Sequence, residues 1–428
     1  MPDLIERVDV HGAQMTVRPG RQLRRYMPHD FEVSYDPPLD LAAIPEQIRL
    51  LPFLWQVAPI VWATDQQLEV DVLDPRVAES FAAVRNELRA MYPSLGWRGE
   101  IKARSVVSAP LPQPTPLTTA ALFSGGIDST WTALKHSGTS LLLITIWGTH
   151  VPVSDRDSWS RVLAKNTAFA DAHAGGFGTI RANLKDLNYL RLRSLSPEIS
   201  HWWTLVQHGM SYTAVTAPLL YRHGVETLMI AASYSPGFNT PWGSDPRIDD
   251  LISLGHARVC HDSYEVERQD KLEGIVARFQ ETGERPPELR VCLDPVKAHG
   301  GNCGRCQKCL RAQLGVYLVG GDPTDYGFPD FRPSILDAVP GMFSSFKFRF
   351  GEGQVYLWTD LKNHITPEAE ASHPTWAWMR GFDFQRYMDV QPERRGPTRS
   401  QRVALGARFS TAYGLARAAT RLRRRFGG

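Results

Sequence analysis

The chain has 428 residues, of which 43% are hydrophobic and 22% are charged, and its net charge is +3. This balance is typical of a folded soluble protein with two or three compact units, and no apolar run approaches the roughly 18 residues that a membrane span needs. The first residues, MPDLIERVDVHG, include acids and lack the apolar stretch of a secretory signal, so we expect a cytoplasmic protein.

The first 107 residues show the periodicities of both strands and helices. Alternating apolar residues at 5–10 and 68–72 predict half-buried strands, and apolar residues at positions 77, 81, 84 and 88 predict a helix over 76–91. We therefore expect a small α+β domain at 1–107, to which the sequence assigns no function. Four prolines between 108 and 119 favour an extended backbone and predict a linker after it.

Beyond the linker, continuous apolar runs alternate with helix-length amphipathic segments. The runs lie at 120–123, 141–147, 227–232 and 256–260. Such a rhythm is typical of a parallel sheet covered on both faces, so we predict an α/β fold with a doubly wound parallel sheet at 118–320. Ligands of this fold bind at the carboxyl ends of the strands.

The remaining residues divide into two segments of different composition. Prolines, glycines and aromatic residues predominate over 321–390, where we expect a C-terminal subdomain. The tail 391–428 has ten Arg, no Lys and one acid, which is 10 − 1 = +9. It could contact a partner, an anionic lipid or a nucleic acid, or it could simply be solvated.

A glycine-rich turn follows the first apolar run of the central domain, in the sequence Ser124-Gly125-Gly126-Ile127-Asp128-Ser129. Glycines let phosphate oxygens approach backbone N–H groups at a helix N-terminus, and the hydroxyls of Ser124, Ser129 and Thr130 can add donors. Asp128 would repel a phosphate, so we expect it to hold Mg²⁺ beside one. The structural alternative is a strand-to-helix turn in which Asp128 and Ser129 only cap the helix. The spacing of a Walker A loop is absent.

Four of the five cysteines lie within eighteen residues, in the pattern C-x10-C-x2-C-x2-C. Four thiolates suit a tetrahedral Zn²⁺, so we predict a structural zinc site. An iron–sulfur cluster is the alternative metal, and His299 is an alternative ligand. The predicted ligands are Cys292, Cys303, Cys306 and Cys309.

The turn SGGIDS resembles the SGGxDS signature of the PP-loop ATP pyrophosphatases, which cleave ATP between the α and β phosphates. The resemblance implies a PP-loop fold of the HUP-like type. It implies that this turn binds pyrophosphate and that the end of the second strand recognises adenine through its backbone, at Ile146, Trp147 and Gly148. It further implies that a substrate is activated as its adenylate.

The turn and the cysteines together resemble the 7-cyano-7-deazaguanine synthases of the QueC type, over residues 118–320. These enzymes adenylate a 7-deazapurine carboxylate and, with ammonia, convert it to an amide and then a nitrile. The resemblance implies ATP, Mg²⁺ and Zn²⁺ as cofactors and Lys271 as a phosphate contact and catalytic residue beside Asp128. It also implies Ser233, Tyr234 and Arg247 as the substrate wall.

The chain departs from that family in three ways. The cysteine of the family's YPDCR-like string is absent from SDPRIDD, where Arg247 remains, and both terminal regions are additional. The carboxylate and the amine therefore stay open, and a partner protein could supply either. QueC-like proteins with such extensions resemble those of bacterial antiviral defence clusters.

Two other functions compete with a carbon–nitrogen ligase. A PP-loop sulfurtransferase that modifies tRNA would need a persulfide cysteine, and Cys260 is the one left outside the predicted metal site. A degenerate domain that senses nucleotide for a partner protein would need no catalytic residue.

Overall fold

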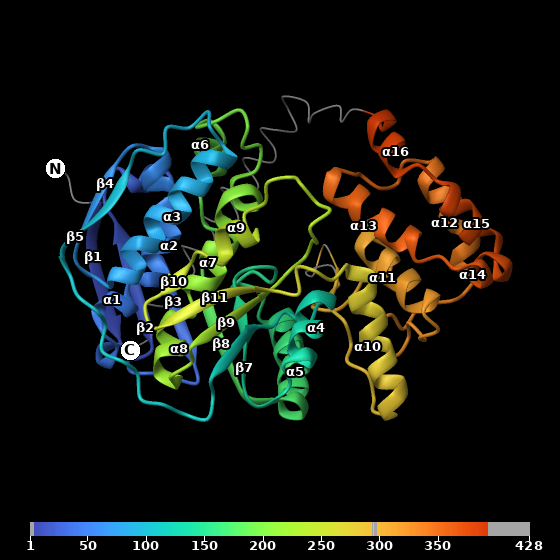
Figure 1. The fold of residues 1–428 in the computed structure, drawn as a ribbon, viewed down its shortest axis with the longest axis horizontal. Helices are drawn as coiled ribbons and strands as arrows, with labels where there is room; N and C mark the ends of the chain where they lie inside the picture. Colours follow the sequence, from blue (N-terminus) through green and yellow to red (C-terminus); the bar gives the residue numbers. More distant parts are fainter. Residues whose placement is uncertain (1–3, 293, 295–297, 393–428) are drawn as a thin grey trace, which may run out of the picture.

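The computed structural model describes residues 4–292, 294 and 298–392 (Figure 1). Nine strands form one sheet in the order β1-β2-β3-β8-β7-β6-β9-β11-β10, and β4 and β5 pair separately. The strands are β1 Ile5–His11, β2 Gln14–Pro19, β3 Phe31–Asp36, β4 Gln67–Leu73, β5 Glu100–Val106, β6 Thr119–Leu122, β7 Gly138–Trp147, β8 Ala174–Ala182, β9 Thr227–Ala231, β10 Ser253–Leu254 and β11 Ala257–Asp262.

Helices account for most of the remaining regular structure. The first ten are α1 Glu46–Arg49, α2 Leu51–Ala63, α3 Pro75–Met91, α4 Ile127–Lys135, α5 Arg156–His173, α6 Tyr189–Arg193, α7 His208–Ala214, α8 Ala217–His223, α9 Pro246–Asp249 and α10 Arg268–Thr282. They are followed by α11 Gln307–Leu318, α12 Ile335–Ser344, α13 Glu352–Asn363, α14 Pro367–Ser372, α15 Pro374–Gly381 and α16 Phe384–Val390. No helix in these described ranges has the length and apolar character needed to cross a membrane.

The five central strands are parallel and lie in the order β8-β7-β6-β9-β11. Numbered by their place in the chain, these strands have the order 3-2-1-4-5, which is found in doubly wound α/β folds. The direction of winding reverses between β6 and β9. A crevice forms outside the carboxyl ends of the strands at such a reversal, and the glycine-rich turn follows β6 there.

Alternation along the central strands assigns the two faces of the sheet to two hydrophobic cores. In β7, Leu142 and Ile144 belong to one core, whereas Leu141 and Leu143 belong to the other. Successive side chains of a strand point to opposite faces, so both faces are covered. Helices α7 and α8 pack on the first face, and α4 and α5 pack on the second. The expected α/β class is thus confirmed.

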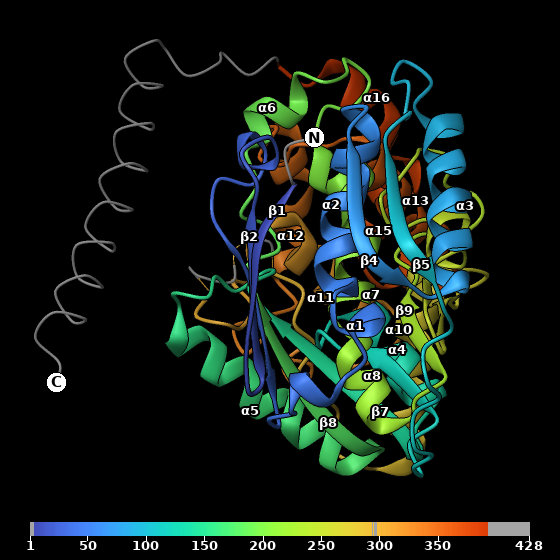
Figure 2. The ribbon, with the colours of Figure 1, turned by 90° about the vertical axis from the view of Figure 1, so that its left-hand side faces the viewer.

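The N-terminal residues continue the central sheet. Strand β3 pairs with β8 in antiparallel register, Val33 opposite Ala182 and Asp36 opposite Thr179, and Figure 2 shows β1 and β2 along the same edge. All thirteen residues of α2 are buried in the core shared with α7 and α8. Residues before and after the boundary expected at residue 107 therefore share the nine-stranded sheet and one hydrophobic core. Residues 108–118 form a connection without helix or strand.

Helices α12 to α16 form a bundle beside α10 and α11, at the end of the molecule opposite β1, β4 and β5 (Figure 1). Their apolar residues make a core of their own, which includes Leu310 and Leu314 of α11 and is centred on aromatic rings such as Phe343 and Trp358. Helix α13 contacts both α10 and α11. The basic tail expected at 391–428 lies outside the described residues from position 393 onward.

Candidate functional site

The glycine-rich turn lies at the carboxyl end of β6 and leads into α4. Gly125 has φ +73°, and a Cβ at this position would lie 2.9 Å from Asn166 Oδ1. A left-handed backbone against a buried neighbour is compatible only with glycine at low cost. The backbone at Gly126 then begins α4, so the turn presents the start of a helix to the crevice.

Hydroxyl groups hold the turn together from inside. Ser124 N–H donates to Ser129 Oγ at 3.2 Å, the two serine Oγ atoms are 3.1 Å apart, and Gly126 N–H donates to Ser124 Oγ at 3.3 Å. Thr130 Oγ1 is buried behind the turn and has no hydrogen-bond partner among the described residues. The expected hydroxyls therefore gather at this turn, but Thr130 does not line the crevice.

Asp128 is paired with an arginine that the sequence does not single out. Arg268, at the start of α10, donates from Nε to Asp128 Oδ1 at 3.0 Å and from Nη2 to Oδ2 at 2.6 Å. Burial would raise the pKa of Asp128, but the charges of Arg268 and Lys271 hold it below its ordinary value. Both carboxylate oxygens are engaged, so the arrangement does not fit Mg²⁺ bound to Asp128 while Arg268 stays in place.

Lys271 lies one turn beyond Arg268 but is turned away from the crevice. Its side chain is 1% exposed, and Nζ donates to the carbonyl oxygen of Ala232 at 2.8 Å, at the end of β9. Burial lowers its pKa, while Asp128 raises it and Arg268 lowers it further. The ammonium group therefore fixes α10 against β9, and Arg268 is the cation of α10 that reaches the crevice.

Two adjoining cavities open beside the turn. The smaller has a volume of about 180 Å³ and an apolar lining drawn from β6, β7 and β9 that includes Phe123, Ile146 and Ile230. The larger has a volume of about 420 Å³ and is lined by α10, α11, α13 and the segments around α7. Both are lined by Ser124, Gly126, Asp128, Ser233 and Arg290.

Cations predominate among the charged groups of the larger cavity. Its lining includes Lys185, Arg268, Arg290, Lys308 and Arg311, against Asp128 and Asp360. Arg290 also supports the turn, since its Nε donates to Ser124 O at 3.0 Å and its backbone N–H donates to Gly125 O at 2.6 Å. Burial, followed by repulsion from Arg268, lowers the pKa of Arg311 to about 9. The charged lining of the cavity is therefore positive on balance, which would attract anions.

Aromatic and imidazole side chains form the opposite wall of the same cavity. A π-helical segment, Trp203–Gln207, precedes α7 and places Trp203 beside Tyr212, with ring centroids 5.4 Å apart. Burial lowers the pKa of His208 to about 3, and positive charges nearby, first that of Lys185, add to the shift. His208 is thus neutral around pH 7. The rings of Trp203 and Tyr212 meet edge to face, and Lys185 Nζ lies 5.1 Å from the centroid of the Trp203 ring. The wall is thus aromatic and also carries the charge of Lys185.

The three positions expected to recognise adenine lie in different surroundings. Ile146 lines the smaller cavity. Trp147 instead stacks on Trp159 at a centroid distance of 5.1 Å. Gly148 has φ +108°, and a Cβ there would lie 1.9 Å from Ala182 O, so this glycine allows the strand ends to approach. Of the three residues, Ile146 is the one that lines either of the two cavities.

The expected substrate wall is only partly assembled. Ser233 lines both cavities, and its Oγ lies 3.4 Å from Asp128 Oδ2. Tyr234 stacks on Phe238 at 3.9 Å between centroids and lines neither cavity. Arg247 forms an exposed ion pair with Asp245 at 2.9 Å, and it too lies outside both linings.

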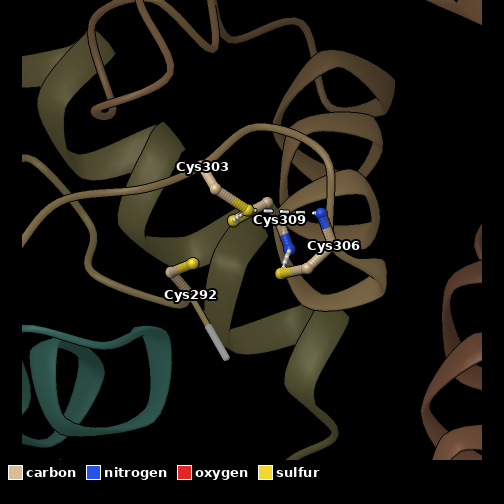
Figure 3. A group of neighbouring side chains, drawn as sticks. All are labelled: Cys292, Cys303, Cys306 and Cys309. Atoms are coloured by element: carbon tan, nitrogen blue, oxygen red, sulfur yellow. Dashed lines mark hydrogen bonds between the residues drawn. The ribbon is translucent and has the colours of Figure 1, made fainter. Parts of the chain in front are cut away.

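The four clustered cysteines converge as expected (Figure 3). The sulfur atoms of Cys292, Cys303, Cys306 and Cys309 all lie within 4.8 Å of one another, and Cys303 Sγ is 3.9 Å from Cys309 Sγ. Tetrahedral zinc with Zn–S distances of about 2.3 Å needs sulfur atoms about 3.8 Å apart. The cluster could therefore hold a metal ion such as zinc.

Backbone amides donate hydrogen bonds to two of the clustered sulfur atoms. Cys306 N–H donates to Cys303 Sγ at 3.3 Å, and Cys309 N–H donates to Cys306 Sγ at 3.5 Å. Cys292 belongs to the cluster and also lines the larger cavity. The candidate metal centre is thus part of the cavity wall.

The remaining candidates do not join this centre. His299 has φ +48°, and its carbonyl oxygen accepts from Arg161 Nε at 2.7 Å. Cys260 lies in β11 opposite Met229 and lines neither cavity. A second group, Glu267, Asp360 and His364, has ligand atoms within 4.8 Å of one another. Both ring nitrogens of His364 already lie within hydrogen-bonding distance of oxygens, at Asp360 and Asp270.

Sequence reasoning missed the groups that charge the cavity, because they come from distant segments. Lys185, His201 and Trp203 follow β8, a strand whose glycines at 175, 176 and 178 hide its apolar pattern. Arg268 and Lys308 each lie within four residues of a predicted site residue, and that proximity is the signal in the sequence that could have found them.

Comparison with protein-family models, curated proteins and solved structures finds no match to this chain.

Proposed function

We propose that the chain is an ATP-dependent carbon–nitrogen ligase that cleaves ATP into AMP and pyrophosphate. A substrate carboxylate attacks the α phosphorus, the acyl-adenylate forms as pyrophosphate leaves, and ammonia or an amine then displaces AMP. The observation that carries the proposal is the glycine-rich turn at the strand-order reversal, with an apolar cavity on one side and a basic cavity on the other.

The two cavities divide the parts of ATP between them. The apolar lining around Ile146 and Ile230 suits an adenine ring, whereas the basic lining suits the phosphates and an acid. Ser124 and Gly126 line both cavities, so the helix start they present lies at the junction. An α phosphate at this junction would face the cavity in which a carboxylate binds.

The protein's contribution to the reaction is positioning and charge stabilisation. The N–H groups of the turn and the guanidinium groups of Arg268 and Arg290 would balance the charge that develops on the leaving pyrophosphate. No step is assigned to Mg²⁺ at Asp128, because Arg268 holds that carboxylate. The zinc expected at the cysteine cluster would have four protein ligands and no open position, so we assign it a structural role.

The resemblance to the QueC type suggests a 7-deazapurine carboxylate as the first acid to test. The aromatic rings of Trp203 and Tyr212 and the neutral His208 offer contacts to a heteroaromatic ring. Both an amide and a nitrile product are compatible with this wall. A place in a bacterial antiviral defence system is a further part of the proposal that rests on the resemblance alone.

The test is AMP and pyrophosphate release from Mg²⁺–ATP in the presence of 7-carboxy-7-deazaguanine and ammonium. We expect AMP formation that depends on the acid and falls about 100-fold in Asp128→Ala, because this change would release Arg268 from its position beside the turn. Asp71→Ala removes a carboxylate that is 70% exposed and should leave the rate unchanged. ATP binding without AMP formation with this or other acids would favour a nucleotide sensor.

A further inference from the structure

Helix α11 projects two cations into the larger cavity, one on each side of the last clustered cysteine in the sequence. Lys308 and Arg311 lie three residues apart, hence on one face of the helix, and both line the cavity. Arg311 is 7% exposed. These residues belong neither to the glycine-rich turn nor to the expected substrate wall.

The two cations lack a neighbouring acid in the part of the chain that the structure describes. The hydrogen bond of the Arg311 guanidinium is from Nη1 to Gln307 Oε1 at 3.1 Å, a neutral acceptor in the same helix. Within the described ranges, neither Lys308 nor Arg311 has a carboxylate within ion-pair distance. Asp128 is held by Arg268, and Asp360 Oδ2 accepts from the backbone N–H of Gln269 at 3.0 Å. Asp128 is therefore engaged elsewhere, whereas Asp360 Oδ1 has no hydrogen-bond partner among the described residues and lies 3.5 Å from His364 Nδ1.

Three physical effects oppose placing cations here. The N-terminus of α11 carries the positive end of the helix dipole, which disfavours Lys308 in the first turn. Arg268 faces the same cavity and repels both cations. A buried cation also loses hydration, and among the described residues no carboxylate within ion-pair distance replaces it. An anionic ligand would reverse all three effects at once.

We propose that Lys308 and Arg311 form an oxyanion-binding site in the larger cavity, separate from the glycine-rich turn. Its ligand is a carboxylate or a terminal phosphate group, held by the planar guanidinium of Arg311 and the ammonium of Lys308. The site deepens the proposed function and rests on it for the identity of the ligand, which is the acid substrate or the far end of ATP.

The cysteine cluster fixes this site in place. Cys306 caps α11, and Cys309 lies between Lys308 and Arg311 in its first turns. A metal held by these cysteines would lock the helix start and thereby the direction of both cations. Arg305, between Cys303 and Cys306, is exposed and lines neither cavity. It is a cation next to the same cysteines that does not belong to the proposed site, and so provides a matched control.

The experiment is calorimetric titration of the metal-loaded chain with three probes: inorganic pyrophosphate, 7-carboxy-7-deazaguanine and adenosine. We expect Arg311→Gln and Lys308→Gln each to raise the Kd of one oxyanion probe by about tenfold or more, the worth of one hydrogen bond to a charged group. Weakened pyrophosphate binding identifies a phosphate site, and weakened binding of the deazaguanine identifies a carboxylate site. Adenosine binding stays unchanged, as do all three affinities in Arg305→Gln.

The proposal is overturned if both variants, folded and loaded with metal, bind both oxyanion probes as the parent does. It is equally overturned if the parent binds neither oxyanion at millimolar concentration. Metal content and thermal midpoint identify a variant that has not folded, and Lys308, being less buried, provides the second variant if Arg311→Gln fails. Oxyanion binding that depends on Arg311, without any AMP formation, would reject the proposed ligase and leave this site standing.

Discussion

Two of the walls of the larger cavity are built differently. The wall at the sheet is formed by Ser233 and by Ser124 and Gly126 of the turn. Hydroxyl hydrogen bonds between neighbouring residues close this turn, and Arg290 adds a long-range contact to it. The wall at the helices is formed by Arg268, Lys308 and Asp360, side chains from three helices. The first wall is shaped by local chain geometry, whereas the second depends on long-range packing and on charge.

This difference suggests where each wall is vulnerable. A group fixed by its own turn remains in place as long as the strand and helix beside it are intact. Charged side chains from separate helices keep their positions only while the helices are held together and their charges are balanced. We therefore expect perturbations of metal and of pH to separate the two walls.

The largest effect is expected from removing one ligand of the cysteine cluster. Cys309→Ser leaves three thiolates and a buried hydroxyl, so the metal should be lost and the start of α11 released. Loss of a structural metal is among the few changes that cost about 4 kcal/mol or more of unfolding free energy. Metal content by elemental analysis and unfolding by denaturant measure the two effects.

Cys260→Ser is the matched control, because Cys260 lies outside the cluster and both cavities. It should retain the metal stoichiometry of the parent. Full metal content in Cys309→Ser, or none in the parent, would show that the helical wall does not depend on a metal.

A smaller effect concerns acid and the sheet wall. Asp262 ends β11 and accepts hydrogen bonds from Thr132 Oγ1 at 2.7 Å and Lys135 Nζ at 3.2 Å, which tie α4 to the sheet. Burial alone would raise its pKa, but hydrogen bonds from His136, Ser263 and Thr132 and the charge of Lys135 lower it to about 2. The ionised carboxylate therefore stabilises the helix that begins at the glycine-rich turn.

The sign of the pH dependence follows from this depressed pKa. The stabilisation is present above the unfolded value of 3.8 and is lost as the pH falls through about 2. The shift corresponds to about 2 kcal/mol. Denaturant unfolding between pH 5 and pH 2 should show this loss in the parent and a smaller one in Asp262→Asn. If the unfolding free energy of the two proteins depends equally on pH, ionised Asp262 does not stabilise the fold. Asp71→Asn, at an exposed site, should show the same pH dependence as the parent.

The two walls also differ in how well the sequence predicts them. The residues of the turn 124–126 are adjacent in the chain, so the sequence alone indicates that they gather at one place. On the helical side, the same holds for the closely spaced Cys303, Cys306 and Cys309. Arg268 pairs with Asp128 across 140 residues, and Asp360 reaches the cavity from a helix in a region without a motif. The helix α2 was also missed, since it is apolar on all sides and has no helical periodicity. A pairing between distant residues, such as that of Arg268 with Asp128, leaves no local pattern in a single sequence.

Asp360 gives the smallest expected effect, and its sign is opposite to that of Asp262. Burial, followed by a hydrogen bond shared with Glu267, raises the pKa of Asp360 to about 7, and His364 opposes the shift. An acid with a raised pKa binds its proton more tightly in the folded state. The free energy of unfolding should therefore fall as the pH rises from about 4 to about 7, because an ionised Asp360 destabilises the helical wall.

Asp360→Asn tests this sign directly. The amide oxygen can still accept from Gln269 N–H but carries no charge, so the variant should be more stable than the parent at pH 8, by about 1 to 2 kcal/mol. The gain is below the full shift because the proton is shared with Glu267. The two proteins should be equally stable at pH 4, and Asp337→Asn, which alters an exposed carboxylate of the same bundle, should follow the parent throughout. A gain of equal size at pH 4 and pH 8 would mean that packing, and not charge, limits the helical wall.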